Sequence, residues 1–197
     1  SGTYDGSSHT VTVSGGSGGT IQYRTSTTGT WSTTKPTRAV AGTTTVYVQV
    51  VGDNNHSTTD CGSKDIVINK KPLTITASDQ SISYGSSIAT GVDKVTTSGL
   101  ISGHVLTSIT LTASTTIVTT SGVITPSAAK VQVTNTSGAD VTTNYDITYR
   151  TGTLVITKVS ATCPTLTAYS GEYDSYSHTI TVSGGNGGTI QYRTSTS

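Results

Sequence analysis

The sequence predicts an all-β protein built from tandem β-sandwiches. Thr and Ser account for 45 and 28 of the 197 residues, there is no Met, and Glu172 is the single glutamate. β-Branched residues lose side-chain freedom in helices and pack well on a pleated sheet. Apolar and polar residues also alternate in short runs, separated by turn residues every 8–12 residues or so, a spacing typical of a sandwich.

An internal repeat is the third observation behind this prediction. Ser170–Ser197 repeats Ser1–Thr28 with 22 identities in 28 positions, at a constant offset of 169. The chain therefore holds one full period of a repeat and the start of the next, a pattern typical of a tandem array. Arrays usually span distance or multiply weak contacts rather than house one active site.

Residues 1–70 form the first predicted unit. Alternation predicts strands at His9–Ser14 and Thr20–Thr27, joined as a hairpin by the Gly-rich turn at Gly15–Gly19. Further strands are predicted at Thr43–Gly52 and Ser63–Asn69, with a turn at Asp53-Asn54-Asn55 between them. This unit is also expected to lack its first strand.

Residues 71–158 form the second predicted unit, which begins at the junction Lys70-Lys71-Pro72. Proline removes a ladder donor and restricts the residue before it to extended geometry. Six runs show strand alternation, and one more strand is expected within Thr115–Thr125. The six runs are Leu73–Ala77, Ser81–Tyr84, Thr107–Ala113, Lys130–Val133, Tyr145–Tyr149 and Thr153–Lys158. Residues 159–197 are predicted to be a linker and the start of the next first-type unit.

Charge and hydropathy exclude two classes of partner. The net charge is +1, and only Lys70 and Lys71 among the basic residues are adjacent. No basic field for nucleic acid is therefore expected. No run approaches 18 apolar residues, so no membrane span is predicted.

The second unit resembles the MBG domain, an immunoglobulin-like (Ig-like) module of bacterial surface proteins and adhesins. The resemblance is carried by Leu73–Ser87 (LTITASDQSISYGSS), by Gly99–Gly103 and by Asn144–Lys158 (NYDITYRTGTLVITK). An acidic residue commonly follows the Gly99–Gly103 element in that family. In this chain the residue at that position is His104, so no role of the family's acidic residue is carried over.

The first unit resembles a companion bacterial Ig-like repeat. The matching residues are Thr3–Val13, Ile21–Ser32 and Ala41–Val50. Both resemblances imply tandem Ig-like sandwiches in secreted or wall-attached stalk and adhesion proteins. They imply an extracellular location, no enzymatic activity, no cofactor, and neighbouring copies of the same repeat as partners. They name no host or glycan ligand.

The two cysteines are predicted to form disulfides across repeats. Adding the offset of 169 to Cys61 gives a cysteine 67 residues after Cys163. A complete first-type unit would then carry one cysteine in its first strand and one in its last. Such a bridge contributes roughly 4 kcal/mol in the chain-entropy model. Cys61 is expected to pair with a cysteine of the preceding repeat or with Cys163 of another chain, and two free buried thiols are the alternative.

Asp5 and His9 place an acid and a base close together, with two serines between them at residues 7–8. A catalytic triad needs a base oriented toward a nucleophile. The second copy repeats the pair as Asp174 and His178, as a structural turn would. We therefore predict a turn, and no catalytic site.

Asp53-Asn54-Asn55, and Asp140 with Asn144 and Asp146, offer oxygen ligands for calcium. No spacing matches a calcium loop, so turn residues and no metal site are predicted. The Gly15–Gly19 run lacks the Lys-Ser/Thr ending of a phosphate loop.

Other candidates have structural explanations. Trp31 is predicted to plug the core of the first unit against Tyr23 and Tyr47. An isopeptide bond among Lys64, Asp65 and Asn69 is disfavoured, because alternation places them on different faces. Weak N-glycan acceptor patterns occur at residues 55–57 and 135–137.

The sequence thus predicts a non-enzymatic stalk or fibre segment of a bacterial surface protein. One alternative is a module that binds a glycan or host protein, for which Tyr176 is the best exposed aromatic. Another is a self-assembling filament or sheath subunit, in which the C-terminal copy donates a strand to a neighbour.

Overall fold

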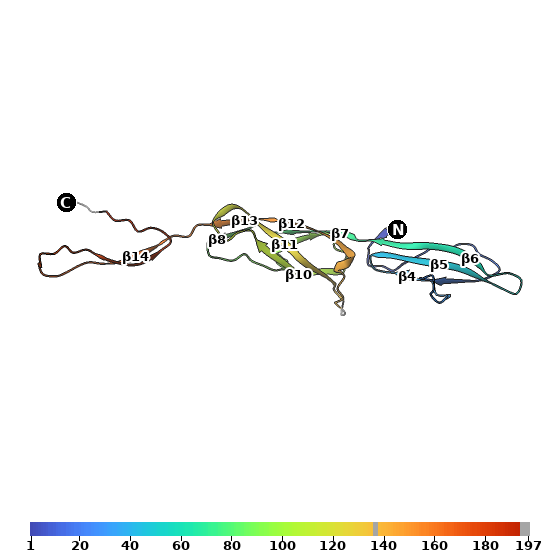
Figure 1. The fold of residues 1–197 in the computed structure, drawn as a ribbon. Helices are drawn as coiled ribbons and strands as arrows, with labels where there is room; N and C mark the ends of the chain where they lie inside the picture. Colours follow the sequence, from blue (N-terminus) through green and yellow to red (C-terminus); the bar gives the residue numbers. More distant parts are fainter. Residues whose placement is uncertain (136–137, 194–197) are drawn as a thin grey trace.

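The computed structural model describes residues 1–135 and 138–193. The chain is all-β, as predicted, and its strands lie in successive groups along an elongated molecule (Figure 1). In the described residues, no sheet crosses residue 70 or residue 158. No helix there is both long and apolar enough to span a membrane.

The first unit contains two sheets. One has the order β1-β6-β5-β3, and the other pairs β2 with β4. The strands are β1 (Gly2–Thr3), β2 (His9–Thr10), β3 (Gly19–Arg24), β4 (Thr37–Arg38), β5 (Gly42–Gly52) and β6 (Thr59–Asn69). Val46, Ile66 and Ile68 point from β5 and β6 into the core, where Tyr23 of β3 joins them.

The predicted hairpin between residues 9–14 and 20–27 is wrong. β3 pairs with β5 over Gly19–Arg24, and β2 pairs with β4. The glycine run between β2 and β3 carries the chain from one sheet to the other, with Gly15 and Gly16 at φ 75° and 95°. Glycine adopts these positive φ values without steric cost. The strand pairings show that the run crosses between the two sheets and does not form a tight hairpin turn.

The second unit also contains two sheets, with the orders β10-β11-β13-β8 and β12-β7-β9. Leu73 and Ile75 of β7 pack in a cluster shared with the first unit, whereas Ile124 and Leu154 form a second cluster. The strands are β7 (Lys71–Ala77), β8 (Gln80–Ser83), β9 (Val95–Ser98), β10 (His104–Ala113), β11 (Thr119–Val133), β12 (Tyr145–Arg150) and β13 (Gly152–Thr157).

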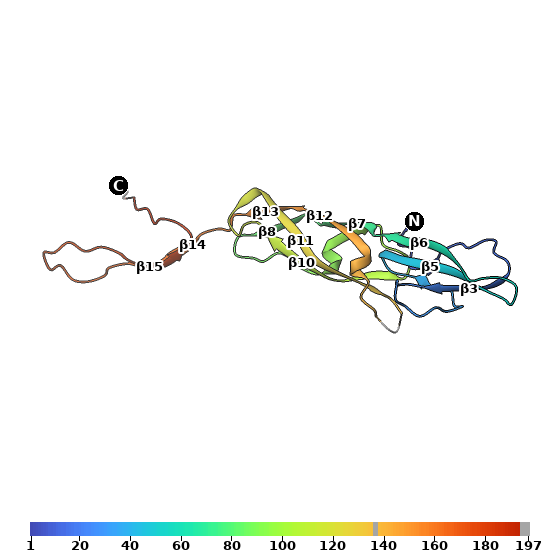
Figure 2. The ribbon, with the colours of Figure 1, turned by 45° about the vertical axis from the view of Figure 1, so that its right-hand side comes forward.

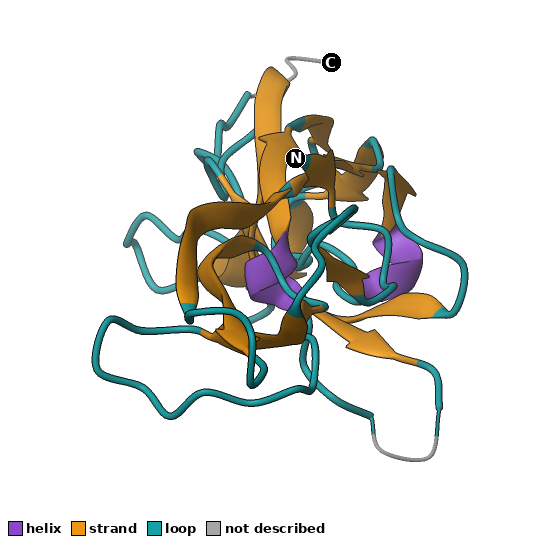
Figure 3. Ribbon diagram, turned by 90° about the vertical axis from the view of Figure 1, so that its right-hand side faces the viewer, coloured by secondary structure: helices purple, strands orange, loops and turns teal. Residues whose placement is uncertain are grey.

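Two single turns of 3₁₀ helix interrupt the strands of the second unit (Figure 3). They are η1 (Val92–Lys94) and η2 (Thr142–Asn144). Each leads directly into a strand of the β12-β7-β9 sheet. The η2 turn brings Asn144 and Tyr145 to the end of the unit that faces residues 1–70.

The C-terminal segment forms a hairpin-like pair, β14 (Thr162–Thr167) with β15 (Thr181–Asn186). It exposes side chains that the first copy of the repeat buries. Tyr173 is 94 % exposed, whereas its equivalent Tyr4 is 4 % exposed. Ile180 is 45 % exposed, whereas its equivalent Val11 is 8 % exposed.

Candidate functional site

The candidate site is the junction between the first two units, where Lys70 alone separates β6 from β7. Tyr4 N–H donates to the carbonyl of Asn69, the last residue of β6, over 2.8 Å. Tyr145 lies opposite Lys71 in the parallel pair of β12 and β7. Two tyrosines therefore flank the linker, one held by each unit, and Figure 2 shows the N-terminus beside the point where β6 continues into β7.

An aromatic cluster fills the junction. The Tyr4 and Tyr145 rings meet edge to face, with centroids 5.9 Å apart and an interplanar angle of 81°. His104 contacts both rings, at 6.0 Å from Tyr4 and 5.9 Å from Tyr145. Edge-to-face pairs add to the stabilisation that burial provides.

Hydrogen bonds orient this cluster. The Tyr145 hydroxyl accepts from Ile101 N–H over 3.2 Å and lies 2.6 Å from His104 Nδ1. With Nδ1 unprotonated, the hydroxyl donates its proton to this nitrogen. Neutral His104 therefore satisfies both groups.

A direct hydrogen bond also crosses the junction. Ala41 N–H of the first unit donates to Asn144 Oδ1 of the second over 2.8 Å. Arg38 holds the Ala41 segment in place, since its guanidinium donates to the carbonyls of Val40, Ala41 and Thr43. A short linker, a shared apolar cluster and a cross-unit hydrogen bond together restrict bending at this point.

Burial changes the proton affinities of the junction residues. It lowers the pKa of His104, because the charged imidazolium loses hydration. It raises the pKa of Tyr145 and of Tyr4, and the neighbouring Asn144 side chain partly offsets the change at Tyr4. The uncharged forms of all three groups are favoured.

Sequence reasoning noted His104 only as a departure from a family pattern, and it did not single out Tyr4 or Tyr145 as site residues. One signal was present, because Tyr4 recurs as Tyr173 at the repeat offset. Tyr4 contacts His104 and Tyr145, which lie 100 and 141 positions further along the chain. The packing of the two units sets these contacts, and a single sequence does not display them.

The Asp5–His9 pair forms a turn in both copies of the repeat. Asp5 Oδ1 accepts from Ser7 N–H and lies 2.9 Å from His9 Nε2. The equivalent Asp174–His178 distance is 2.7 Å. The His9 bond and the Ser7 N–H lower the pKa of Asp5.

Trp31 lies at the edge of the first unit rather than within its core. It is half-buried, and the Arg24 guanidinium covers its ring with Cζ 4.3 Å from the centroid. Arg24 also lies 5.6 Å from the Tyr47 ring. This position differs from the predicted core plug, because an arginine rather than the facing sheet covers the indole.

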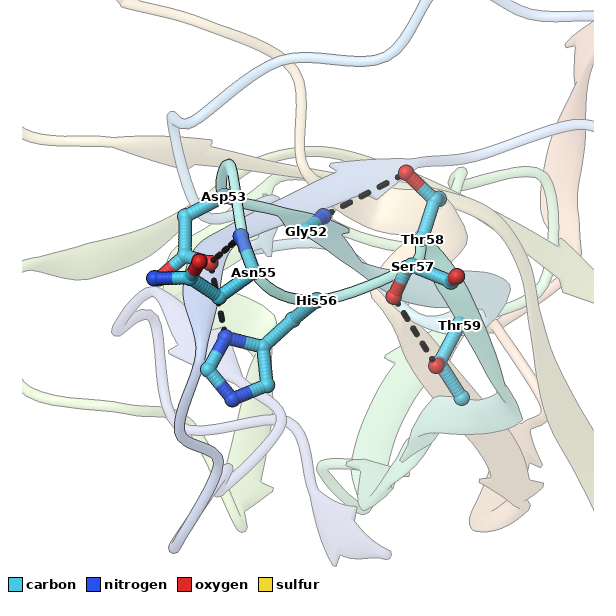
Figure 4. Close-up of polar contacts among 7 residues, drawn as sticks. All are labelled: Gly52, Asp53, Asn55, His56, Ser57, Thr58 and Thr59. Atoms are coloured by element: carbon cyan, nitrogen blue, oxygen red, sulfur yellow. Dashed lines mark hydrogen bonds and ion pairs between the residues drawn. The ribbon is translucent and has the colours of Figure 1, made fainter.

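The acidic turns expected between strands make local hydrogen bonds. Asp53 Oδ1 accepts from Asn55 N–H and contacts His56 Nδ1 at 2.7 Å (Figure 4). Asp140 Oδ1 accepts from Thr142 N–H. Within residues 1–135 and 138–193, no group of three or more His, Cys, Asp or Glu side chains is placed to hold a metal ion.

The remaining candidates lie on the surface. Lys64, Asp65 and Asn69 are all exposed, so no apolar site for an isopeptide bond surrounds them. Cys61 and Cys163 are exposed free thiols in this chain. The acceptor pattern at residues 55–57 lies in the β5–β6 turn, and residues 136–137 of the other pattern lie outside the described residues.

The fold and the junction define a class of elongated all-β repeat protein. A scan against protein-family models gave no match, and a search of curated proteins gave none either. The MBG and Ig-like resemblances therefore remain predictions.

Proposed function

We propose that this chain is a non-enzymatic, extracellular spacer, a segment of a stalk made of alternating Ig-like units. The observation that carries the proposal is the junction, where Lys70 is the whole linker and Tyr4, Asn144 and Tyr145 connect the two units. Domains in one chain usually move relative to each other unless a large, hydrophobic interface joins them. A junction restricted in this way keeps successive units in line.

The repeat supports the same proposal. A period of 169 residues returns Tyr4 as Tyr173 and the Asp5 turn as the Asp174 turn. The left-handed residue of that turn is Gly6 in one copy (φ 80°) and Ser175 in the other (φ 69°). Tyr4 contacts the unit that follows it, and it recurs as Tyr173. Each repeat of the array would therefore have the same restricted junction.

Distance measurement between spin labels tests the stiffness of the junction. Labels are placed at Cys61 and at Ser121→Cys, at exposed positions of the first and second units, in a chain that carries Cys163→Ser. We expect one narrow distance distribution, which Tyr4→Ala combined with Asn144→Ala broadens. Tyr173→Ala is the matched control, because the equivalent tyrosine is exposed and should leave the distribution unchanged. A broad distribution in the chain without the junction substitutions would contradict the spacer proposal.

A further inference from the structure

Residues 12–17 of the first unit, called the edge here, follow β2 outside any assigned strand, and no described strand pairs with them. Their side chains alternate as in a strand, since Val11 is buried and Val13 packs against the core, whereas Thr12 and Ser14 are exposed. An extended segment with unpaired backbone groups is a template for another strand.

The second copy of the repeat shows which strand fits this edge. Residues 181–186, the repeat equivalents of residues 12–17, form β15 and pair antiparallel with β14. The glycine conformations match between copies. Gly15 and Gly184 both have φ 75°, and Gly16 and Gly185 have φ 95° and 83°. At these two glycines, the edge of the first unit has the backbone conformation found in β15, which binds β14.

Burial favours moving β14 to the first unit. In its own hairpin, Leu166 lies opposite Val182 and is 62 % exposed. Val182 is the equivalent of Val13, which packs on the core of the first unit. In the same register, Leu166 of a docked strand would lie beside Val13 and lose contact with water, which is favourable for an apolar side chain.

The same register brings two cysteines together. β14 pairs Thr162 with Asn186 and Pro164 with Gly184, so Cys163 lies opposite Gly185, the equivalent of Gly16. Cys61 lines one pocket together with Gly16 and the two residues that follow it, Ser17 and Gly18.

Cys61 lies in a bulge of β6. The pairing with β5 shifts by one residue between Ser63 and Asp60, and Gly62 adopts φ 80° there. Bulges of this kind redirect a side chain out of the regular sheet pattern. The β5–β6 turn drawn in Figure 4 forms the other wall of the pocket through Asn55, His56 and Ser57.

We propose that residues 12–17 accept the β14 strand of a second copy of this chain, and that Cys61 of the acceptor then forms a disulfide with Cys163 of the donor. Each copy carries one acceptor edge and one donor strand on different units. The contact is therefore head to tail and generates an open chain of copies rather than a closed dimer. This assembly goes beyond the spacer function and does not depend on the stiffness of the junction.

The covalent step needs an oxidant of the disulfide class, such as glutathione disulfide. One cysteine thiolate attacks a glutathione sulfur and releases one glutathione thiolate, which leaves a mixed disulfide. The second cysteine thiolate attacks the protein sulfur of this mixed disulfide and releases the second glutathione. Two protein thiols are oxidised, one glutathione disulfide is reduced to two thiols, and two protons are redistributed to the released thiolates.

Single-cysteine chains test the pairing directly. Cys61→Ser and Cys163→Ser chains are mixed in equal amounts with a glutathione redox buffer, and the products are separated without reductant and mapped by mass spectrometry. We expect the Cys61–Cys163 heterodimer to exceed the two homodimers together by about ten-fold, since docking brings only these sulfurs within bonding range. Random collision would give equal amounts of heterodimer and summed homodimers, and that result would overturn the proposal.

A substitution in β14 tests whether strand docking causes the pairing. Thr165→Pro in the donor removes a backbone donor at an exposed position of β14 and should slow heterodimer formation about ten-fold. Thr189→Pro makes the same change outside the strand and should not slow it. Equal rates for both donors, or a Cys61–Cys163 bond within one copy of the unsubstituted chain, would refute docking. Neither result would alter the spin-label distances that test the spacer.

Discussion

The side chain of Asn144 is 3 % exposed and connects the two units through Ala41 N–H. The residue ends the η2 turn, and its own N–H donates to the carbonyl of Val141. A buried amide that keeps a partner contributes modestly to stability, but its removal leaves the other group unsatisfied. This asymmetry makes Asn144 the most sensitive polar residue of the junction.

Replacing Asn144 with Ala should lower the free energy of unfolding by about 1–3 kcal/mol, because Ala41 N–H loses its acceptor in a partly buried place. Urea denaturation of the full chain, followed by circular dichroism, measures the change. Asn186→Ala, at an exposed position, is the control and should shift stability by less than about 0.5 kcal/mol. Equal effects of the two substitutions would show that the cross-unit bond does not stabilise the protein.

His104 should make the junction sensitive to acid. Burial lowers its pKa in the folded protein from the ordinary value of 6.5, so the unfolded chain binds a proton more readily. Stability is then fully present above pH 6.5 and decreases as the pH falls through the window below that value. The groups facing the imidazole are Tyr4 and Tyr145, neither of which titrates there.

The measurement is the urea midpoint of the chain between pH 7.5 and pH 5.5. We expect it to decrease with acidification and expect His104→Gln to flatten the dependence over this range. Asn186→Ala, which removes no titratable group from an exposed position, is the control and should leave the slope unchanged. A slope that survives His104→Gln would assign the acid sensitivity to another group.

At the scale of the elements, β11 is the longest strand of the β10-β11-β13-β8 sheet, and a bend in it contacts the other sheet of the second unit. It spans 15 residues and pairs with β10 along most of its length, but with β13 only between Thr119 and Ile124. The register against β10 shifts near Ala128, which has φ 51°. The adjacent Ala129 N–H donates to the hydroxyl of Tyr149 in β12, so the bend links the strand to the other sheet.

Left-handed backbone costs a non-glycine residue roughly 1–2 kcal/mol, and glycine loses about 0.5–1 kcal/mol through its greater freedom when unfolded. Ala128→Gly should therefore raise the free energy of unfolding by about 0.5 kcal/mol. Ala129→Gly, one residue further along, lacks the positive φ and removes a buried methyl, so it should lower stability by about 1 kcal/mol. Thermal unfolding of the two variants checks the opposite signs, and the same sign for both would contradict strain at Ala128.

Strand positions followed from the sequence better than strand partners did. The alternation in TTTVYVQVVG and LTITA marks residues that lie in β5 and β7, because one face of each strand meets a core. The same alternation in residues 9–14 and 20–27 suggested a hairpin that does not form. Alternation reports which face is buried but not which neighbour lies alongside, and the parallel pairs of β1 with β6, β7 with β12 and β8 with β13 leave no local signal.

At the scale of the whole molecule, the two connections between groups of strands differ. Lys70 lies at a junction packed by Tyr4 and Tyr145, whereas Lys158 begins a connection to β14 whose residues are exposed. Proteolysis favours segments that open locally without loss of packing. The two lysines therefore offer a direct comparison of a restricted and an unrestricted connection.

Brief trypsin treatment should cleave after Lys158 before it cleaves after Lys70. The expected product is a fragment of residues 1–158 that keeps the urea midpoint of the full chain. Mass spectrometry of the time course identifies both sites. Cleavage after Lys70 at the same rate would mean that the junction opens freely. The Tyr4→Ala chain provides the comparison, because cleavage after Lys70 should be faster in it.

The sequence alone determined the all-β class, the 169-residue period and the strand-forming runs, because β-branched composition, repetition and alternation are local properties of the chain. The tertiary structure decided how those strands pair and which residues from both units meet at Lys70. Tyr4, His104 and Tyr145 lie far apart along the chain, and their contact depends on the packing of two units against each other. The tertiary structure also gives identical residues different surroundings in the two copies, as Tyr4 and Tyr173 show. Burial depends on neighbouring strands rather than on local sequence.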